Sequence, residues 1–571
     1  MNVKKLVCSI ISLSLLVNCG IAALPVSASA VDTDTEIYVS PDGNDSNSGS
    51  SESPFKTLER AKAEVRVHNS NMSGNIIVNI ASGVYYMDNT LEFTQADSGT
   101  NGFSVIYRGI TDENGNSPIV SGGVDISDNW ELYDESLNIY KHENIDWSFR
   151  QLYTNNDRAI RARVPNLENK ETGGPYFRAS GGDGSYPLFI GTNNEYAQKA
   201  GNDAEIIWNS SWSQFRARIE SYNSSTGRVT FKAPDNSFAW NHHTQGDTPF
   251  YLENSLAYLD SEGEWYLDKD TSTLYYKPRE GEIMNKTEII APKLETIIDI
   301  NGTDENKTEN ITFDGIQFLH SNWLAPDSYG YCSVQGGFRY QSEGGKDNSA
   351  IRGSARYDAP KSMVQLRHTK NISLINSEFS FSGSWGIMGY EDTENTFIDH
   401  NVFTKNAGGG VTMGMAGREW DDQTENEQPR TYTDTDGQSR YDTITNNYID
   451  HVACEYQDMV GIGAMLPQHM TIANNEIGYL PYTGINIGWN WLDTDHGMTA
   501  NKVYQNYIHN TCMLLQDGGG IYSLGRMNGD SNFYYNYITD IEMSEWAPHN
   551  NLMGIYFDNG SCYKKSSIKC I

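Results

Sequence analysis

The chain has 571 residues and a formal net charge of -33, which argues against nucleic acids and anionic membranes as partners because both would repel it. Two of the seven cysteines lie in the first thirty residues and the others are scattered, so neither a disulfide framework nor a CxxC or HExxH zinc spacing is present. We therefore expect no metal and no cofactor.

Residues 1–30 have the layout of a secretory signal peptide: Lys4 and Lys5, a long apolar run, and then Ala28-Ser29-Ala30. This pattern predicts export and a mature chain that begins at Val31. No later stretch approaches the ~20 consecutive apolar residues that a membrane span needs. We expect a secreted, extracellular and monomeric protein.

Residues 31–125 are predicted to hold a short amphipathic helix over 53–66, which would cap a stack of strands that begins at 75–87. From 126 to 286 the strand segments alternate without a period and read as an inserted antiparallel β-domain. The strand pattern resumes over 287–561. The acidic run 417–440 has little apolar content and is predicted to be an exposed loop.

Five asparagines recur inside short strand motifs such as ITNNYI and VYQNYI, at Asn401, Asn447, Asn475, Asn506 and Asn536. After a first gap enlarged by the acidic run, the intervals are 28, 31 and 30 residues. A period of this length with room only for short strands favours a parallel β-helix. We expect the asparagine side chains to stack, each bonding its neighbours one rung above and below, which is a structural role.

A second motif, with Gly-Ile at its centre, recurs as GIMGY (386–390), GIGAM (461–465), GINIG (484–488), GIYSLG (520–525) and GIYFDNG (554–560). These segments are predicted to be equivalent strands of one sheet with their isoleucines in the core. Acids and aromatics gather around them. The candidates are Glu455, Trp489, Asn490, Trp491, Asp493, Asp517, Tyr522 and Asp558.

Aromatic rings beside carboxyl groups suit a groove that cleaves sugars, because rings stack on pyranose faces and two carboxyls supply acid and base or nucleophile. A surface aspartate is more often solvating than catalytic, but the three glycines after Asp517 leave room for a ligand to approach. For Trp489 and Trp491, inward packing is the alternative to facing a groove.

Several segments together resemble glycoside hydrolase family 141 over nearly the whole mature chain: YVSPDGNDSNSGSSESPFKTLERA, RQLYTNNDRAIRARVPN, LPYTGINIGWNW, LLQDGGGIYSLG and GIYFDNGS. The resemblance implies an all-β fold, a right-handed parallel β-helix, and α-L-fucosidase activity on pectin or xylanase activity. It also implies that Asp517 and Asp558 are the catalytic residues.

Two features depart from this pattern. On straight strands, Asp517 and Asp558 would be separated by seven residues, or roughly 23 Å, which is too far for a glycosidase pair. We therefore expect either that the Gly518–Gly520 run bends the chain back or that one aspartate has another partner, the nearest being Asp493, Asp495 and Glu455. The tail 562–571, CYKKSSIKCI, does not read as a buried strand and suggests a truncation or frameshift that would impair activity.

The sequence therefore predicts a hydrolase of plant cell-wall polysaccharide. One alternative is a Ca²⁺-dependent, pectate-lyase-like enzyme, although almost no basic residue other than Arg526 lies near the Gly-Ile strands. The other alternative is a carbohydrate-binding solenoid without catalytic activity.

Overall fold

The structure is a computed structural model that describes residues 34–179, 189–235, 248–338, 340–341, 357–414, 437–489, 491, 493, 495–542, 552–562 and 565–567. The predicted signal peptide and most of the acidic run lie outside these residues. At the end of that run, Gln438 and Ser439 are buried rather than exposed as predicted, because they hydrogen-bond to the carbonyl of His496 and to Thr393. No helix in the described part of the chain is long and apolar enough to cross a membrane.

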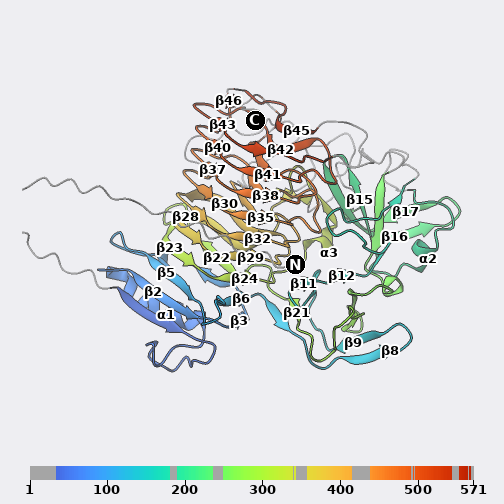
Figure 1. Cartoon of the computed structure of the whole chain (residues 1–571), viewed down its shortest axis with the longest axis horizontal. Helices are drawn as coiled ribbons and strands as arrows, with labels where there is room; N and C mark the ends of the chain where they lie inside the picture. Colours follow the sequence, from blue (N-terminus) through green and yellow to red (C-terminus); the bar gives the residue numbers. More distant parts are fainter. Residues whose placement is uncertain are drawn as a thin grey trace, which may run out of the picture.

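Parallel strands stacked rung upon rung form the main body, and the chain visits three columns of strands in turn (Figure 1). The first column runs β1 (Thr35–Val39), β2 (Ile76–Ala81), β5 (Val105–Ile110), β23 (Thr308–Asp314), β28 (Ser362–Ile375), β31 (Phe397–Asp399), β34 (Thr443–Thr445), β37 (Thr471–Ala473), β40 (Lys502–Tyr504), β43 (Asn532–Tyr534) and β46 (Lys565–Ser567).

The second column contains the Gly-Ile strands. It runs β4 (Leu91–Phe93), β22 (Ile298–Asn301), β28 again, β30 (Trp385–Glu394), β33 (Val411–Met413), β36 (Ile462–Ala464), β39 (Ile485–Ile487), β42 (Gly518–Ser523) and β45 (Leu552–Phe557). The register aligns Ile387, Val411, Ile462, Ile485, Ile521 and Ile555, as predicted for equivalent strands.

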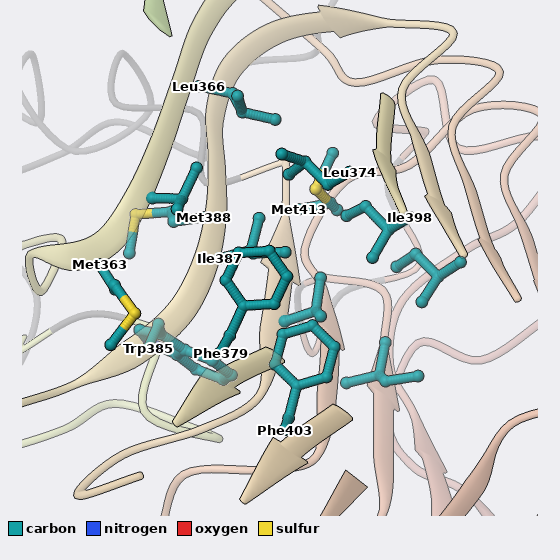
Figure 2. Packing of buried hydrophobic residues seen from close by; sticks show 14 of the residues in the cluster. Met363, Leu366, Leu374, Phe379, Trp385, Ile387, Met388, Ile398, Phe403 and Met413 are labelled. Atoms are coloured by element: carbon teal, nitrogen blue, oxygen red, sulfur yellow. The ribbon is translucent and has the colours of Figure 1, made fainter. Parts of the chain in front are cut away.

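The third column runs β3 (Val84–Tyr86), β6 (Ile119–Ser121), β24 (Gln317–Leu319), β29 (Glu378–Ser380), β32 (Val402–Thr404), β35 (Tyr448–Asp450), β38 (Glu476–Gly478), β41 (Tyr507–His509) and β44 (Tyr537–Ile538). The three columns enclose one core of aliphatic and aromatic side chains. In it, Phe318, Phe379 and Phe403 stack on successive rungs with ring centroids 5.2 Å apart, and Figure 2 shows the last two side by side.

The asparagine stack is present as predicted. The amide nitrogens of Asn447 and Asn475 each donate to the side-chain oxygen of the next asparagine at 2.9 Å, and Asn506 does the same to Asn536. The oxygens also accept backbone N–H groups, so these side chains are satisfied within the turn and are not available to a ligand.

The predicted N-terminal helix is α1 (Leu58–His68), which begins where the Thr57 hydroxyl accepts the N–H of Arg60. Its buried residues Leu58, Ala61 and Val65 join the core beside β1 and β2. At the other end, residues of the predicted atypical tail form β46, which pairs in parallel with β43. A strand at the end of a stack needs backbone hydrogen bonds to only one neighbour, so its polar composition does not prevent pairing.

Between β6 and β22 the strands are mainly antiparallel and form separate sheets, to the right of the main body in Figure 1. They are β7 (Gly123–Asp125), β8 (Glu131–Asp134), β9 (Ile139–Glu143), β10 (Tyr153–Thr154), β11 (Asp157–Arg158), β12 (Ile160–Arg161), β13 (Arg163–Val164), β14 (Phe177–Arg178), β15 (Glu205–Ser210), β16 (Ser213–Asn223), β17 (Arg228–Phe231), β18 (Pro249–Glu253), β19 (Glu264–Asp268), β20 (Thr273–Tyr276) and β21 (Ile289–Pro292).

These inserted sheets have their own cores and include the short helix α2 (Glu195–Lys199). The two ends of the insertion pair with each other, β21 with β7, and β25 (Tyr331–Cys332), which follows the insertion in the chain, pairs with β16 at its side. The remaining short elements are α3 (Ala325–Tyr329), β26 (Tyr340–Gln341) and β27 (Tyr357–Asp358). The inserted sheets therefore flank the Gly-Ile column.

Candidate functional site

Asp517 lies immediately before β42, and the chain changes direction at this residue. Its φ of 58° is in the left-handed region, so the bend occurs at the aspartate itself. The glycines after it do not bend the chain back, contrary to the sequence prediction, because Gly518–Gly520 lie inside β42 and are buried. Their small size is needed for another reason: a Cβ on Gly519 would lie 2.2 Å from the Met553 carbonyl oxygen on the next rung.

Asp558 directly follows β45, the rung after β42, and two tyrosines connect it with Asp517. Tyr522 on β42 and Tyr556 on β45 are register partners. The Tyr522 hydroxyl donates to Asp558 Oδ2, and the Tyr556 hydroxyl donates to Asp517 Oδ1 at 3.2 Å. Each hydroxyl thus contacts the aspartate of the neighbouring rung.

The crossed pairs link the two aspartates through side chains of adjacent rungs. The Tyr522 and Tyr556 rings meet edge to face with centroids 5.2 Å apart, and each hydroxyl holds a carboxylate from the other rung. Both aspartates are half-buried. The estimate for straight strands followed the backbone alone and did not include the reach of the side chains.

The tyrosine hydroxyls act as hydrogen-bond donors at any physiological pH. Burial is the largest cause that raises the pKa of Tyr522, and the charges of Asp558 and Asp517 raise it further. For Tyr556 the causes are the same, with burial first and then both carboxylates, and its pKa also rises. A protonated phenol stabilises a neighbouring carboxylate, so the four groups form one charge-assisted cluster.

The backbone around Asp517 is held from two sides. The Tyr482 hydroxyl donates to the Asp517 carbonyl at 2.9 Å and accepts from Gln335 at 2.8 Å. The N–H of Gln516 donates to the carbonyl of Ser211 at 3.0 Å. Ser211 lies in the turn between β15 and β16. The inserted sheets therefore reach the site and fix one edge of it.

Asn486 lies one rung before Tyr522 and is fully buried, and among the described residues neither atom of its side-chain amide has a hydrogen-bond partner. An unsatisfied buried amide is costly and is typical of positions that contact water or ligand. Sequence reasoning missed Asn486, Tyr482 and Tyr556. The recurring tyrosine of GIYSLG and GIYFDNG was a usable signal for Tyr556, because equivalent strand positions lie side by side.

Trp489 packs inward, which was the alternative to facing a groove, whereas the predicted sugar contact of Trp491 stays a prediction. Trp489 is only 1% exposed and packs in the core against Phe338 and Trp491, because the chain turns inward after Gly488 with φ 104°. Trp491 is half-buried and Asp493 is exposed. Asn490 lies outside the described residues.

Glu455 lies away from the two aspartates and joins the main body to the inserted sheets. Its carboxylate accepts Arg158 at 2.5 Å and Gln151 at 2.9 Å. Burial opposes its charge, but Arg158 and Arg216 hold the pKa of Glu455 below its ordinary value. These partners make Glu455 a bridge between the main body and the inserted sheets, and its predicted contact with substrate stays a prediction.

Among the described residues, one group has the composition of a metal site. Ligand atoms of Asp304, His368 and Asp392 lie within 4.8 Å of one another. Lys307 Nζ is 2.8 Å from Asp392 Oδ1, so this chain already supplies a cation to the group. The group lies on β28, β30 and the loop before β23, and not at the rungs of Asp517 and Asp558.

Comparisons with known proteins agree with this architecture. The family described as "GH141 insertion domain" matches residues 137–279, within the antiparallel sheets. A solved structure described as "Glycoside hydrolase" superposes with a TM-score of 0.80 at 25% sequence identity, covering 93% of this chain and 92% of that chain.

Two further solved structures superpose less well. A complex of XylC with xylose has a TM-score of 0.46 at 12% identity, covering 92% of this chain and 68% of that one. A family 136 lacto-N-biosidase from Eubacterium ramulus has a TM-score of 0.34 at 10% identity, covering 93% and 67%. No curated protein matches the sequence. The chain resembles glycoside hydrolase family 141, and its architecture is that of a glycoside hydrolase.

Proposed function

We propose that this protein is a secreted glycoside hydrolase that cleaves plant cell-wall polysaccharide, a pectin fucoside or xylan, with Asp517 and Asp558. The observation that carries the proposal is the crossed pairing of the two aspartates with Tyr522 and Tyr556 on adjacent rungs. The resemblance to family 141 supports the sugar chemistry. We also propose a right-handed coil for the parallel strands and a monomeric enzyme.

Hydrolysis of a glycoside needs two carboxyl groups in different protonation states. One, protonated, gives its proton to the glycosidic oxygen as the bond to the anomeric carbon breaks. The other, ionised, attacks the anomeric carbon or takes a proton from the attacking water. Asp517 and Asp558 fill these two roles, and Tyr522 and Tyr556 orient the carboxyl groups that they contact.

The test replaces each aspartate by asparagine and measures release of reducing sugar from pectin and xylan. We expect Asp517→Asn and Asp558→Asn each to lower kcat by about 10³-fold, the scale of a lost acid or base. Asp540→Asn is the matched control, because Asp540 is exposed and has a positive φ that asparagine tolerates. A fully active Asp517→Asn enzyme would refute the proposal.

The same variants assign the roles. The phenolate of an aryl glycoside made from an acidic phenol leaves without protonation. Such a substrate should therefore restore activity to the variant that lacks the general acid and not to the variant that lacks the base or nucleophile. Activity should survive a chelator. An unsaturated product whose formation requires Ca²⁺ would instead identify a lyase.

A further inference from the structure

A cavity of about 420 Å³ lies at the seam between the inserted sheets and the parallel strands. One wall comes from residues 157–163 of the insertion, and the other comes from residues 404–405, 450–451 and 454–457 of the main body. Lys170 at the cavity wall has a side chain that is 62% exposed, so the cavity reaches the protein surface. Neither Asp517 nor Asp558 lines it.

The wall of this cavity is basic in an otherwise acidic protein. Six basic side chains line it, against four acidic ones, an excess of two positive charges in a chain of net charge -33. The basic residues are Arg158, Arg161, Arg163, Lys170, Arg216 and Lys405.

All four acidic side chains at the wall are already bound by residues of the chain. Asp157 pairs with Lys170 at 2.7 Å, and Asp450 lies 2.6 Å from His451. The Glu253 carboxylate accepts Arg161 at 3.0 Å and Arg216 at 2.7 Å, and Glu455 is held by Arg158. Each described carboxylate at the wall therefore already has a basic partner.

Arg163 is the cation that these pairings leave without a counter-ion. It is 5% exposed, and within the described ranges its guanidinium forms no ion pair. Its nitrogens donate instead to the carbonyls of Pro165, Gly173 and Pro175 at 3.0, 3.0 and 3.3 Å. Its Cζ lies 3.7 Å above the ring of Tyr251, which stabilises a cation on one face.

A buried charge without a counter-ion is unfavourable, and carbonyl dipoles and an aromatic ring offset only part of this cost. An anion in the cavity would offset more. Lys405, 42% exposed and 3.7 Å from its nearest carboxylate, Asp157, adds a second weakly paired cation. The wall therefore selects a negatively charged ligand.

The size and the remaining lining favour a saccharide over a simple anion. Ligand sites of small molecules have volumes of roughly 300–1,000 Å³, far more than phosphate or sulfate needs. Ile160 and Leu167 supply apolar surface that a sugar ring can cover. We propose that this cavity binds an acidic saccharide, whose carboxylate faces Arg163 and Lys405. The proposal does not depend on catalysis by Asp517 and Asp558.

The experiment measures binding of digalacturonate and of neutral α-1,4-galactobiose to the full chain by calorimetry, because these disaccharides differ in their carboxylates. We expect digalacturonate to bind, with an affinity that falls as salt increases. Lys405→Glu should weaken its binding about tenfold and leave galactobiose unaffected, since the change reverses a charge beside the ligand. Lys199→Glu, a change at a surface lysine of the insertion, is the control and should bind like the unaltered chain.

Arg163→Met tests the buried cation directly, with thermal melting as a check on folding. If it unfolds, the Lys405→Glu result still decides the proposal. Equal binding of the two disaccharides, no binding of digalacturonate up to ~10 mM, or an unchanged affinity in Lys405→Glu would contradict it. Inorganic sulfate that binds as tightly as digalacturonate would show that the cavity recognises charge alone, and the saccharide assignment would be wrong.

Discussion

At the level of single residues, the unusual feature is that each tyrosine of the pair serves the aspartate of the other rung. Tyr522 contacts Asp558 and Tyr556 contacts Asp517, so the orientation of both carboxyl groups depends on the register of β42 and β45. A hydroxyl that donates to a carboxylate stabilises its charged form. The tyrosines should therefore influence both the geometry and the ionisation of the site.

We predict that Tyr556→Phe lowers kcat by roughly tenfold to a hundredfold with little change in KM, because an orienting hydrogen bond is lost while the substrate surface remains. Loss of this donor disfavours ionised Asp517, so the limb of the pH-rate profile that Asp517 governs should move to higher pH. Tyr537→Phe, at a 59% exposed tyrosine of the third column, should leave the profile unchanged. A Tyr556→Phe enzyme that loses activity without a shifted limb would limit Tyr556 to a packing role.

At the level of elements, close contact between β42 and β45 holds the site together. A Cβ on Gly519 would overlap the Met553 carbonyl, whereas a Cβ on Gly554 would meet nothing within 4 Å. We predict that Gly519→Ala separates the two strands and lowers hydrolysis by at least tenfold, and that Gly554→Ala remains active. Activity assays with far-UV circular dichroism make the comparison, and equal activity of the two variants would show that this contact does not set the geometry.

Elements with a period could be predicted from the sequence, and local exceptions could not. The asparagine stack and the Gly-Ile strands follow from spacing alone, because equivalent positions on successive rungs must satisfy the same hydrogen bonds and fill the same core. The positive φ of Asp517 and the inward packing of Trp489 are not indicated by any periodic spacing. Both depend on neighbours on other rungs, which one sequence does not identify.

For the whole molecule, contacts between residues far apart in sequence decide where the insertion sits. Arg158 of the insertion reaches Glu455, and Arg216 Nη2 donates to the Glu455 carbonyl at 2.6 Å. In the sequence Glu455 is one of 74 acidic residues, and no motif or spacing indicates that Arg158 and Arg216 are its partners. The sequence could predict that the insertion exists, but not that a basic cavity forms where it meets the parallel strands.

The balance of buried carboxyl groups predicts how stability of the whole protein depends on pH. Burial raises the pKa of Glu264 from 4.5 to about 7, and burial likewise raises the pKa of Asp442 and of Asp458 to about 6. At these three groups the folded state therefore binds more protons than the unfolded state between about pH 5 and 7, and their contribution to the free energy of unfolding falls as pH rises through this range. Glu394 acts in the opposite sense, because its neighbours Arg440 and Lys307 outweigh burial and lower its pKa to about 2.

We therefore predict that thermal melting between pH 4 and 8 gives the highest Tm near pH 5, with a decline toward neutrality that the net charge of -33 reinforces. Glu264 contributes roughly 3 kcal/mol of this decline, the free energy that corresponds to the rise of its pKa from 4.5 to about 7.

Glu264→Gln loses an acceptor for the N–H groups of Arg163, Asp260 or Ser261 and should be less stable at pH 5, but its decline in stability toward pH 7 should be shallower. Glu262→Gln, at an exposed position two residues earlier, should keep the full slope. An unchanged slope in Glu264→Gln would mean that this carboxyl group is already ionised in the folded protein at pH 5, with its three backbone donors outweighing burial.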